Sequence, residues 1–303
     1  MKKAILSLAL LGLCIGCSQD KSAPAVALVM KTLNNPFFMD MQLGAEEAAQ
    51  RLQLPLIVQA AERELDVEKQ MQIIENLIQR KVAAICLTPA GSREVIPAIL
   101  KANRAGIPVL ILDTRVDSTA LAEAGGKVAT FIGSDNFDGG RIAGERIIEK
   151  LGGIGRVAIL EGIPGHETGD SRLRGFHAAI DKAPGIRIVA SQTANWERDQ
   201  GYNVFQNILQ SHPDVQAVFG CNDMMALGAV EAIAAAGRSA DILVIGFDAI
   251  TDAREAIAAG RMEASIAQNP REMGRLAIEN AARFMRGEQI PAYIPVPIEL
   301  VRK

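Results

Sequence analysis

Short apolar runs alternate with helical patterns along most of this 303-residue chain, and this alternation restricts the fold more than any other feature. Each run is short enough for a strand and continuous enough for a strand buried on both faces. The runs cover residues 26–30, 56–59, 83–88, 109–113, 131–134, 157–162, 186–191, 217–222, 243–248 and 264–268. Helical patterns lie between them at 65–80, 92–105, 139–151, 171–181, 198–211, 224–236 and 271–287. The order predicts parallel sheets covered by helices on both faces, and therefore the α/β class.

The length of the chain predicts two lobes, because one hydrophobic core rarely organises so many residues. No long polar linker separates two halves of the sequence, so we expect the lobes to be joined by several short crossings, one of them near Ser134 and Asp135. The net charge is −3 and no block of like charge stands out, so nothing indicates a nucleic-acid partner.

The amino end has the form of a secretory signal. Two lysines precede an apolar run over 4–16, which is too short to span a bilayer of ~30 Å as a stable helix. Gly16 before Cys17 is similar to a bacterial lipobox, although Cys14 stands where a larger aliphatic residue is usual; ordinary cleavage after Gly16 also fits. Both alternatives give a mature chain that begins at Cys17, with a polar tether over 18–24, and that works outside the cytoplasm.

The stretch from Val26 to Asp40 joins the first predicted strand to the first helix. The sequence Asn34-Asn35-Pro36 predicts a turn, and Pro36 suits the first turn of the helix that follows. Phe37 and Phe38 then lie at the junction. One alternative is a core residue beside a lid over the first helical turn; the other is an apolar platform for a flat-faced ligand, with Asn35 beside it as donor and acceptor.

Polar side chains follow several predicted strands at the point where each strand ends. They are Thr88, Asp113, Asn222, Asp248 and Gln268. Any one of them could simply cap the next helix. Because ligands of parallel α/β sheets bind outside the carboxyl ends of the strands, the set together predicts a polar cleft shared by both halves. Carboxylates accept hydrogen bonds, and amides both donate and accept them. This combination suits a neutral polyhydroxyl compound better than an anion.

The glycine-rich segment 162–169 follows a strand and could in principle hold a phosphate. It lacks the endings of both the P-loop and the dinucleotide-binding motif, so nucleotide binding is not predicted. Arg172, in the first turn of the next helix, can instead contact adjacent hydroxyls and pair with the cleft carboxylates. His166 and Glu167 read as exposed loop residues.

No pattern in the sequence indicates catalysis, a metal or another cofactor. The chain has three histidines, none beside a Ser or Cys nucleophile pattern, and no metal-type Cys or His spacing. Cys86 and Cys221 fall in predicted strands of different halves and read as buried, inert thiols.

The single tryptophan, Trp196, lies between a strand end and a helix of the second half. A partly buried core residue is one alternative. The other is an aromatic face that closes on a sugar ring opposite Phe37 and Phe38, since the C–H surfaces of such a ring are apolar and its rim is polar.

Four motifs resemble the periplasmic ribose-binding proteins, and the similarity covers the chain beyond the signal in the same order. They are Lys31–Phe38, Cys221–Gly228, Val244–Asp248 and Ile266–Gln268. The resemblance implies a type I periplasmic binding protein fold, in which two Rossmann-like lobes joined by three crossings close on a monosaccharide for an ABC importer. It places the N-terminal lobe at 25–134 plus 269–297 and the C-terminal lobe at 135–268 plus 298–303.

The resemblance also implies which residues contact the ligand. The matching positions are Asn35, Phe37, Phe38, Asp113, Arg172, Trp196, Asn222, Asp248 and Gln268, with Trp196 standing where the ribose binders have Phe. Thr88 stands where the ribose binders have Asn, and Thr114 stands where they have Arg. These two differences change which hydroxyls of the ligand can be hydrogen-bonded. Lys31, the segment 124–126 and the segment 195–198 are closer to the allose-binding branch. We therefore expect a pentose or hexose of that group, or a rarer aldose, ketose or polyol.

The expected partners are the sugar and the importer's permease, with a chemoreceptor or sensor kinase as an alternative. The chain is expected to be a monomer that meets the membrane only through a lipid at Cys17. A sugar-responsive repressor shares the two-lobed core but would carry a DNA-binding domain where this chain has a signal. A secreted α/β enzyme is the remaining alternative, and it lacks a nucleophile or metal set.

Overall fold

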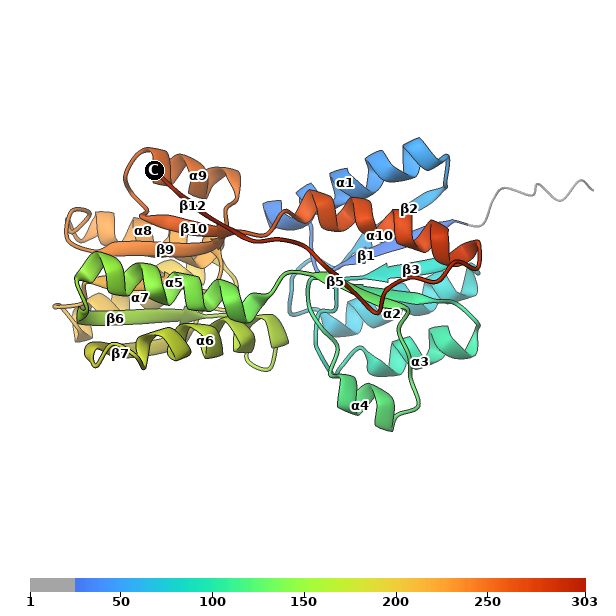
Figure 1. Cartoon of the computed structure of the whole chain (residues 1–303), viewed down its shortest axis with the longest axis horizontal. Coiled ribbons are helices and arrows are strands. Elements are labelled where there is room, and N and C mark those ends of the chain that lie inside the picture. Colours follow the sequence, from blue (N-terminus) through green and yellow to red (C-terminus); the bar gives the residue numbers. More distant parts are fainter. Residues whose placement is uncertain (1–24) are drawn as a thin grey trace, which may run out of the picture.

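The chain forms two α/β lobes that lie side by side, as the sequence predicts (Figure 1). The structure is a computed structural model that describes residues 25–303. The signal, the tether and Cys17 therefore lie outside the described residues. Within 25–303, no helix combines the length and the apolar character that crossing a membrane requires.

The N-terminal lobe is built on a six-stranded parallel sheet with the order β11-β5-β4-β3-β1-β2. Its strands are β1 (Val26–Met30), β2 (Leu56–Ala60), β3 (Ala84–Leu87), β4 (Val109–Leu112), β5 (Thr130–Gly133) and β11 (Tyr293–Pro295). Its helices are α1 (Pro36–Leu52), α2 (Val67–Gln79), α3 (Ile96–Arg104), α4 (Ser118–Glu123) and α10 (Pro270–Met285). Helices α1 and α10 cover one face, and α2 and α3 cover the other (Figure 1).

The C-terminal lobe repeats this plan with the strand order β12-β10-β9-β8-β6-β7. Its strands are β6 (Ile154–Glu161), β7 (Gly185–Thr193), β8 (Ala217–Gly220), β9 (Leu243–Asp248), β10 (Ala264–Ala267) and β12 (Glu299–Arg302). Its helices are α5 (Asn136–Leu151), α6 (Glu167–Ile180), α7 (Arg198–Ser211), α8 (Asp223–Ala235) and α9 (Thr251–Ala258). The expectation of wholly parallel sheets is wrong at one edge, because β12 pairs antiparallel with β10. This strand enters the sheet directly from the other lobe, without a crossover helix.

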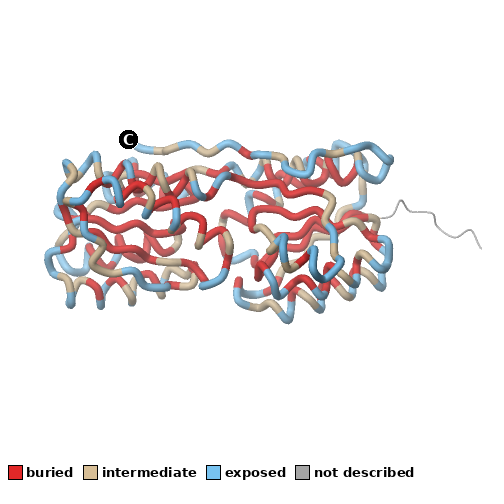
Figure 2. Tube along the Cα trace, turned by 60° about the horizontal axis from the view of Figure 1, so that its bottom comes forward, coloured by how far each residue is buried: buried red, intermediate tan, exposed pale blue. Residues whose placement is uncertain are grey.

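Three crossings join the lobes, in agreement with the expected fold. The chain passes from β5 to α5, from β10 to α10, and from β11 to β12. Buried backbone runs through the strands of both lobes, while the exposed backbone follows the outer helices and loops (Figure 2). The crossings therefore connect two separately covered sheets, the arrangement that allows lobes to move relative to one another.

The second crossing is held in place by a close approach of α10 to α1. A methyl group added at Gly44 would lie 1.9 Å from the backbone oxygen of Arg271, and one at Gly274 would lie 1.9 Å from the backbone oxygen of Met41. Only glycine permits backbones this close. The packing anchors the start of α10, and with it the position of Gln268 just before the helix.

Candidate functional site

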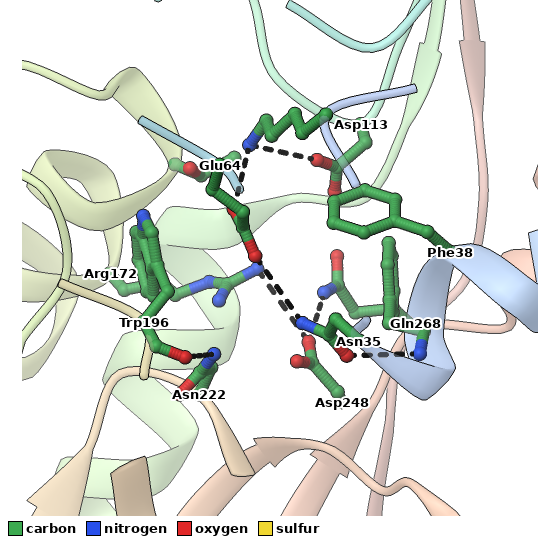
Figure 3. Close-up of a pocket in the computed structure, with 12 residues that line it drawn as sticks. Asn35, Phe38, Glu64, Asp113, Arg172, Trp196, Asn222, Asp248 and Gln268 are labelled. Atoms are coloured by element: carbon green, nitrogen blue, oxygen red, sulfur yellow. Dashed lines mark hydrogen bonds and ion pairs between the residues drawn. The ribbon is translucent and has the colours of Figure 1, made fainter. Parts of the chain in front are cut away.

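A small cavity lies between the lobes, outside the carboxyl ends of the strands (Figure 3). Its lining residues are Lys31, Asn35, Phe37, Phe38, Glu64, Asp113, Thr168, Arg172, Trp196, Asn222, Asp248 and Gln268. Every residue predicted from the sequence to contact a ligand lines this cavity except Thr88 and Thr114, while Glu64 and Thr168 line it without having been predicted.

The start of α1 places an amide and two aromatic rings on the N-terminal wall. Asn35 caps the helix, because its Oδ1 accepts from the backbone N–H of Phe37 at 3.0 Å. Its Nδ2 remains directed at Glu64, at 3.4 Å. The rings of Phe37 and Phe38 pack edge to face with centroids 5.3 Å apart, and both line the cavity. Asn35 thus caps α1 and lines the cavity at the same time.

Lys31 is the buried cation of the same wall. Its Nζ donates to Thr114 Oγ1 at 2.8 Å and lies 3.6 Å from Asp113 and 3.7 Å from Glu64. Thr88 Oγ1 accepts from the backbone N–H of Lys31 at 3.1 Å. Both threonines are fully buried. Thr88 therefore holds the backbone of Lys31 and Thr114 holds its ammonium, and neither threonine lines the cavity.

Arg172 is the buried cation of the C-terminal wall. Its Nε donates to Asn136 at 2.8 Å and its Nη1 donates to the backbone oxygen of Cys221 at 2.6 Å. The guanidinium lies 3.7 Å from the ring centroid of Phe247 and 4.0 Å from Asp248. These contacts fix the orientation of the guanidinium at the cavity, so its planar set of N–H donors is held ready for a ligand.

Asp248 and Gln268 form a hydrogen-bonded pair beside this arginine. Gln268 Nε2 donates to Asp248 Oδ1 at 2.7 Å. Burial raises the pKa of Asp248 well above its ordinary value, and the charge of Arg172 opposes this effect. Among the described residues, Oε1 of Gln268 has no hydrogen-bond partner although it is buried. The pair thus retains an acceptor that a hydroxyl-bearing ligand could satisfy.

Asp223 supports the wall from behind. This fully buried carboxyl accepts from Ser265 Oγ at 2.6 Å and from the backbone N–H of Ile250 at 2.9 Å, which ties down the turn after β9. Burial raises its pKa to about 7. This role of Asp223 was not predicted from the sequence, although Asp223 follows Asn222 directly at the end of a buried strand.

Three cavity residues have positive φ angles, which residues other than glycine rarely adopt. The φ values are 61° at Asp113, 67° at Trp196 and 116° at Asp248. Such strained residues are concentrated at functional sites, where the surrounding structure compensates for the strain. Here the unusual angles occur at two carboxylates and an indole of the cavity lining.

Trp196 is buried in a hydrophobic core cluster and also lines the cavity. The core alternative is therefore confirmed, while stacking on a sugar ring stays a prediction. The ring of Trp196 packs directly over Gly162, where a methyl group would lie 1.9 Å from it. Asn222 Nδ2 donates to the backbone oxygen of Trp196 at 3.1 Å, and Oδ1 of Asn222 caps α8 through Met225.

The interpretation of His166 as an exposed loop residue is wrong. The side chain is buried where the C-terminal lobe meets the backbone of Ala90 in the other lobe, and burial lowers its pKa to about 3. Next to it, the backbone N–H of Glu167 donates to Ser92 Oγ across the cleft at 3.2 Å. Glu167 is half-buried, and burial raises its pKa. The sequence carried no sign of this contact, because the partner surface comes from the other lobe.

The cavity offers a binding surface with mixed polarity. It combines three carboxylates with two cations, amides that donate and accept, and apolar rings on both walls. Within residues 25–303 no group of His, Cys, Asp or Glu side chains is arranged to hold a metal ion. Cys86 and Cys221 are buried and unpaired, and burial raises the pKa of each thiol to about 12. Two lobes, three crossings and a polar cavity between the lobes define the class of two-lobed solute-binding proteins.

Comparison with known proteins identifies the family within this class. Residues 26–289 match the periplasmic binding protein domain, and the chain belongs to this family. It is 39% identical to the ribose import binding protein of Bacillus subtilis, over 93% of this chain and 88% of that protein. It is 37% identical to the D-allose-binding periplasmic protein of Escherichia coli, over 89% of this chain and 87% of that protein.

A solved structure agrees with the fold. The ABC transporter periplasmic solute-binding protein of Actinobacillus succinogenes with bound D-allose superimposes with a TM-score of 0.88 at 43% identity. The similarity covers 92% of this chain and 97% of that protein.

Proposed function

We propose that this protein captures a monosaccharide of the ribose and allose type between its lobes and delivers it to an ABC importer. The observation that carries the proposal is the cavity, in which both lobes present carboxylates, amides and aromatic rings toward one small space. The names of the relatives, a ribose import binding protein and a D-allose-binding protein, support the same ligand class.

The composition of the cavity explains why a neutral sugar suits it. Carboxylates accept from hydroxyls, amides both donate and accept, and Arg172 donates. Phe37, Phe38 and Trp196 offer apolar surface to the C–H faces of a sugar ring.

The energetics are within reach for so small a ligand. A monosaccharide has about 12 heavy atoms, so micromolar affinity requires about −0.7 kcal/mol per atom, well inside the limit for small ligands. A sugar that contacts both walls binds the closed arrangement better than an open one and therefore shifts the population toward it. The permease can then distinguish loaded from empty protein by the relative position of the two lobes.

The finer assignments belong to the same proposal. We place the lobe boundaries at 134/135, 268/269 and 297/298, because the sheet changes between the strands that flank each of these points. The ligand contacts are the predicted residues that line the cavity, with Thr88 and Thr114 supporting Lys31. The protein works by binding and not by catalysis, as a monomer in the periplasm or at the cell surface, with a lipid at Cys17. A chemoreceptor is a second candidate partner.

The test is a thermal-shift screen of the secreted chain against pentoses, hexoses and polyols, followed by calorimetric titration of each hit. A ligand that binds only the native state raises the melting temperature; at 100 times its Kd the stabilisation is about 2.7 kcal/mol. At least one neutral monosaccharide should bind with a Kd in the micromolar range or below. Binding of sugar acids alone, or of no sugar at all, would contradict the proposal.

A further inference from the structure

Glu64 lies on the wall of the cavity although neither its surroundings in the sequence nor the family resemblance indicates it. The residue sits in the loop between β2 and α2, and its side chain is buried. It projects into the space between Asp113 on its own lobe and Trp196 on the other (Figure 3). A carboxylate at this position can contact a ligand bound between the two lobes.

The carboxylate of Glu64 has few partners within the described part of the chain. It accepts one long hydrogen bond, from Asn35 Nδ2 at 3.4 Å. Its other oxygen lies 3.7 Å from Lys31 Nζ, beyond hydrogen-bond distance. An ionised carboxylate can accept about four hydrogen bonds, and a buried one is stable only when most are made. Glu64 is thus an acceptor with unused capacity in the lining of the cavity between the lobes.

The surrounding charges determine what Glu64 can offer. Burial raises the pKa of Glu64, and Asp113 and Glu197 act in the same direction. The ammonium of Lys31 and the amide of Asn35 oppose them. Lys31 lies at nearly equal distances from Asp113 and Glu64, so this one cation faces two carboxyl groups.

A purely structural role as the partner of Lys31 fits the geometry poorly. The short contact of Lys31 is with Thr114, at 2.8 Å, and this bond already fixes the ammonium. A structural ion pair would bring Glu64 to hydrogen-bond distance, about 2.7–2.9 Å. The carboxylate lies nearly 1 Å farther away and turns one oxygen to Asn35, itself a cavity residue.

We propose that Glu64 is a direct, selectivity-determining ligand contact that accepts a hydrogen bond from one particular hydroxyl of the bound sugar. The inference rests on the proposed function and names the chemistry of the ligand further, as a neutral sugar with a hydroxyl directed at the N-terminal wall. Analogues that lack this hydroxyl leave a buried carboxylate without its partner and are rejected.

The test is calorimetric titration of wild type and Glu64→Gln with D-ribose, D-allose and the monodeoxy analogues of whichever binds. Glu62→Gln is the matched control, because Glu62 is exposed two residues away. Glu64→Gln should weaken binding of the parent sugar roughly 10- to 100-fold, the effect of a lost hydrogen bond to a charged group. For one monodeoxy analogue the loss should nearly vanish, while Glu62→Gln should behave as wild type throughout.

The possible outcomes separate the two claims. An equal loss for every analogue would assign Glu64 a structural role and overturn the inference, and so would no loss for any sugar. If neither sugar binds the wild type, a sugar located by the thermal-shift screen replaces them, and failure of the whole screen overturns the proposed function itself. Melting temperatures of the free variants report on folding. If Glu64→Gln does not fold, Glu64→Asp, which keeps the charge but withdraws the carboxylate, is put through the same series.

Discussion

Acid should open this protein through His166, which the closed lobes bury. The imidazole packs against the backbone of Ala90 from the other lobe, and burial lowers its pKa to about 3 from an ordinary 6.5. The charge of Lys31 lowers the pKa further, and a hydrogen bond with the backbone of Ala90 opposes these effects. When the lobes separate, the imidazole is exposed to water and its pKa returns toward the ordinary value.

The sign follows from linkage. A group whose pKa is lower in the closed form takes up a proton only in the open form, so protons favour opening and compete with the ligand. For pKa values of about 6.5 in the open form and about 3 in the closed form, affinity is nearly constant above pH 7.5. It falls by roughly tenfold at pH 5.5 and by roughly tenfold more at pH 4.5.

The assay is the Kd of the cognate sugar between pH 7.5 and 4.5 for wild type, His166→Gln and His177→Gln. Glutamine replaces the imidazole by a polar group that does not titrate, so His166→Gln should lose most of the acid sensitivity. His177 lies exposed on α6, and its replacement should leave the pH profile unchanged. Cavity carboxyls also titrate in acid, so the difference between wild type and His166→Gln is the quantity that counts.

Two results would refute this reasoning. One is a pH profile of His166→Gln that coincides with that of wild type. The other is a His177→Gln profile that loses the acid dependence while His166→Gln keeps it.

Three further expectations concern stacking, closure and anchoring. Saturation with the cognate sugar should change the fluorescence of Trp196, the single tryptophan, and an unchanged spectrum would count against its stacking on the ligand. Asp248→Asn tolerates the left-handed backbone but replaces one acceptor oxygen by a donor, so it should weaken binding by roughly 1–3 kcal/mol. Small-angle scattering should then show wild type, but not this variant, becoming more compact at a sugar concentration that saturates only wild type; no compaction of wild type would rule out the two-lobe clamp. If Cys17 carries a lipid, Cys17→Ser should move the protein from the membrane fraction to the soluble fraction, and equal solubility of both forms would leave ordinary secretion.

Most of the cavity could be predicted because the underlying rule is local. Each strand is a continuous apolar run, and the polar residue that ends it must lie at the carboxyl edge of a parallel sheet. Asp113, Asp248 and Gln268 were found in this way from sequence position alone. Asn35 and Pro36 likewise predicted the start of α1, because helix capping and proline geometry depend only on neighbouring residues.

The direction of individual side chains was decided by tertiary structure. Thr88 ends its strand as predicted, and the family resemblance placed Thr114 at the ligand. Both instead bond Lys31, because the path of each loop after the strand determines where its side chains point. Glu64 reaches the cavity from a loop that follows no polar strand end, so no periodicity marked it. The left-handed angles at Asp113 and Asp248 likewise exist only because the surrounding structure compensates for their strain.

The contact between lobes lies farthest from anything that a sequence pattern records. His166 sits in a glycine-rich loop whose composition is typical of exposed segments, and its burial comes from Ala90, 76 residues earlier in the chain. The edge strand β12 pairs antiparallel with β10 for a similar reason, because the chain enters it from the other lobe through the last crossing. The sequence by itself determined the two sheets and the edge at which the polar residues gather. Tertiary packing decided which of them face the cavity, because that depends on surfaces brought together only when both lobes have formed.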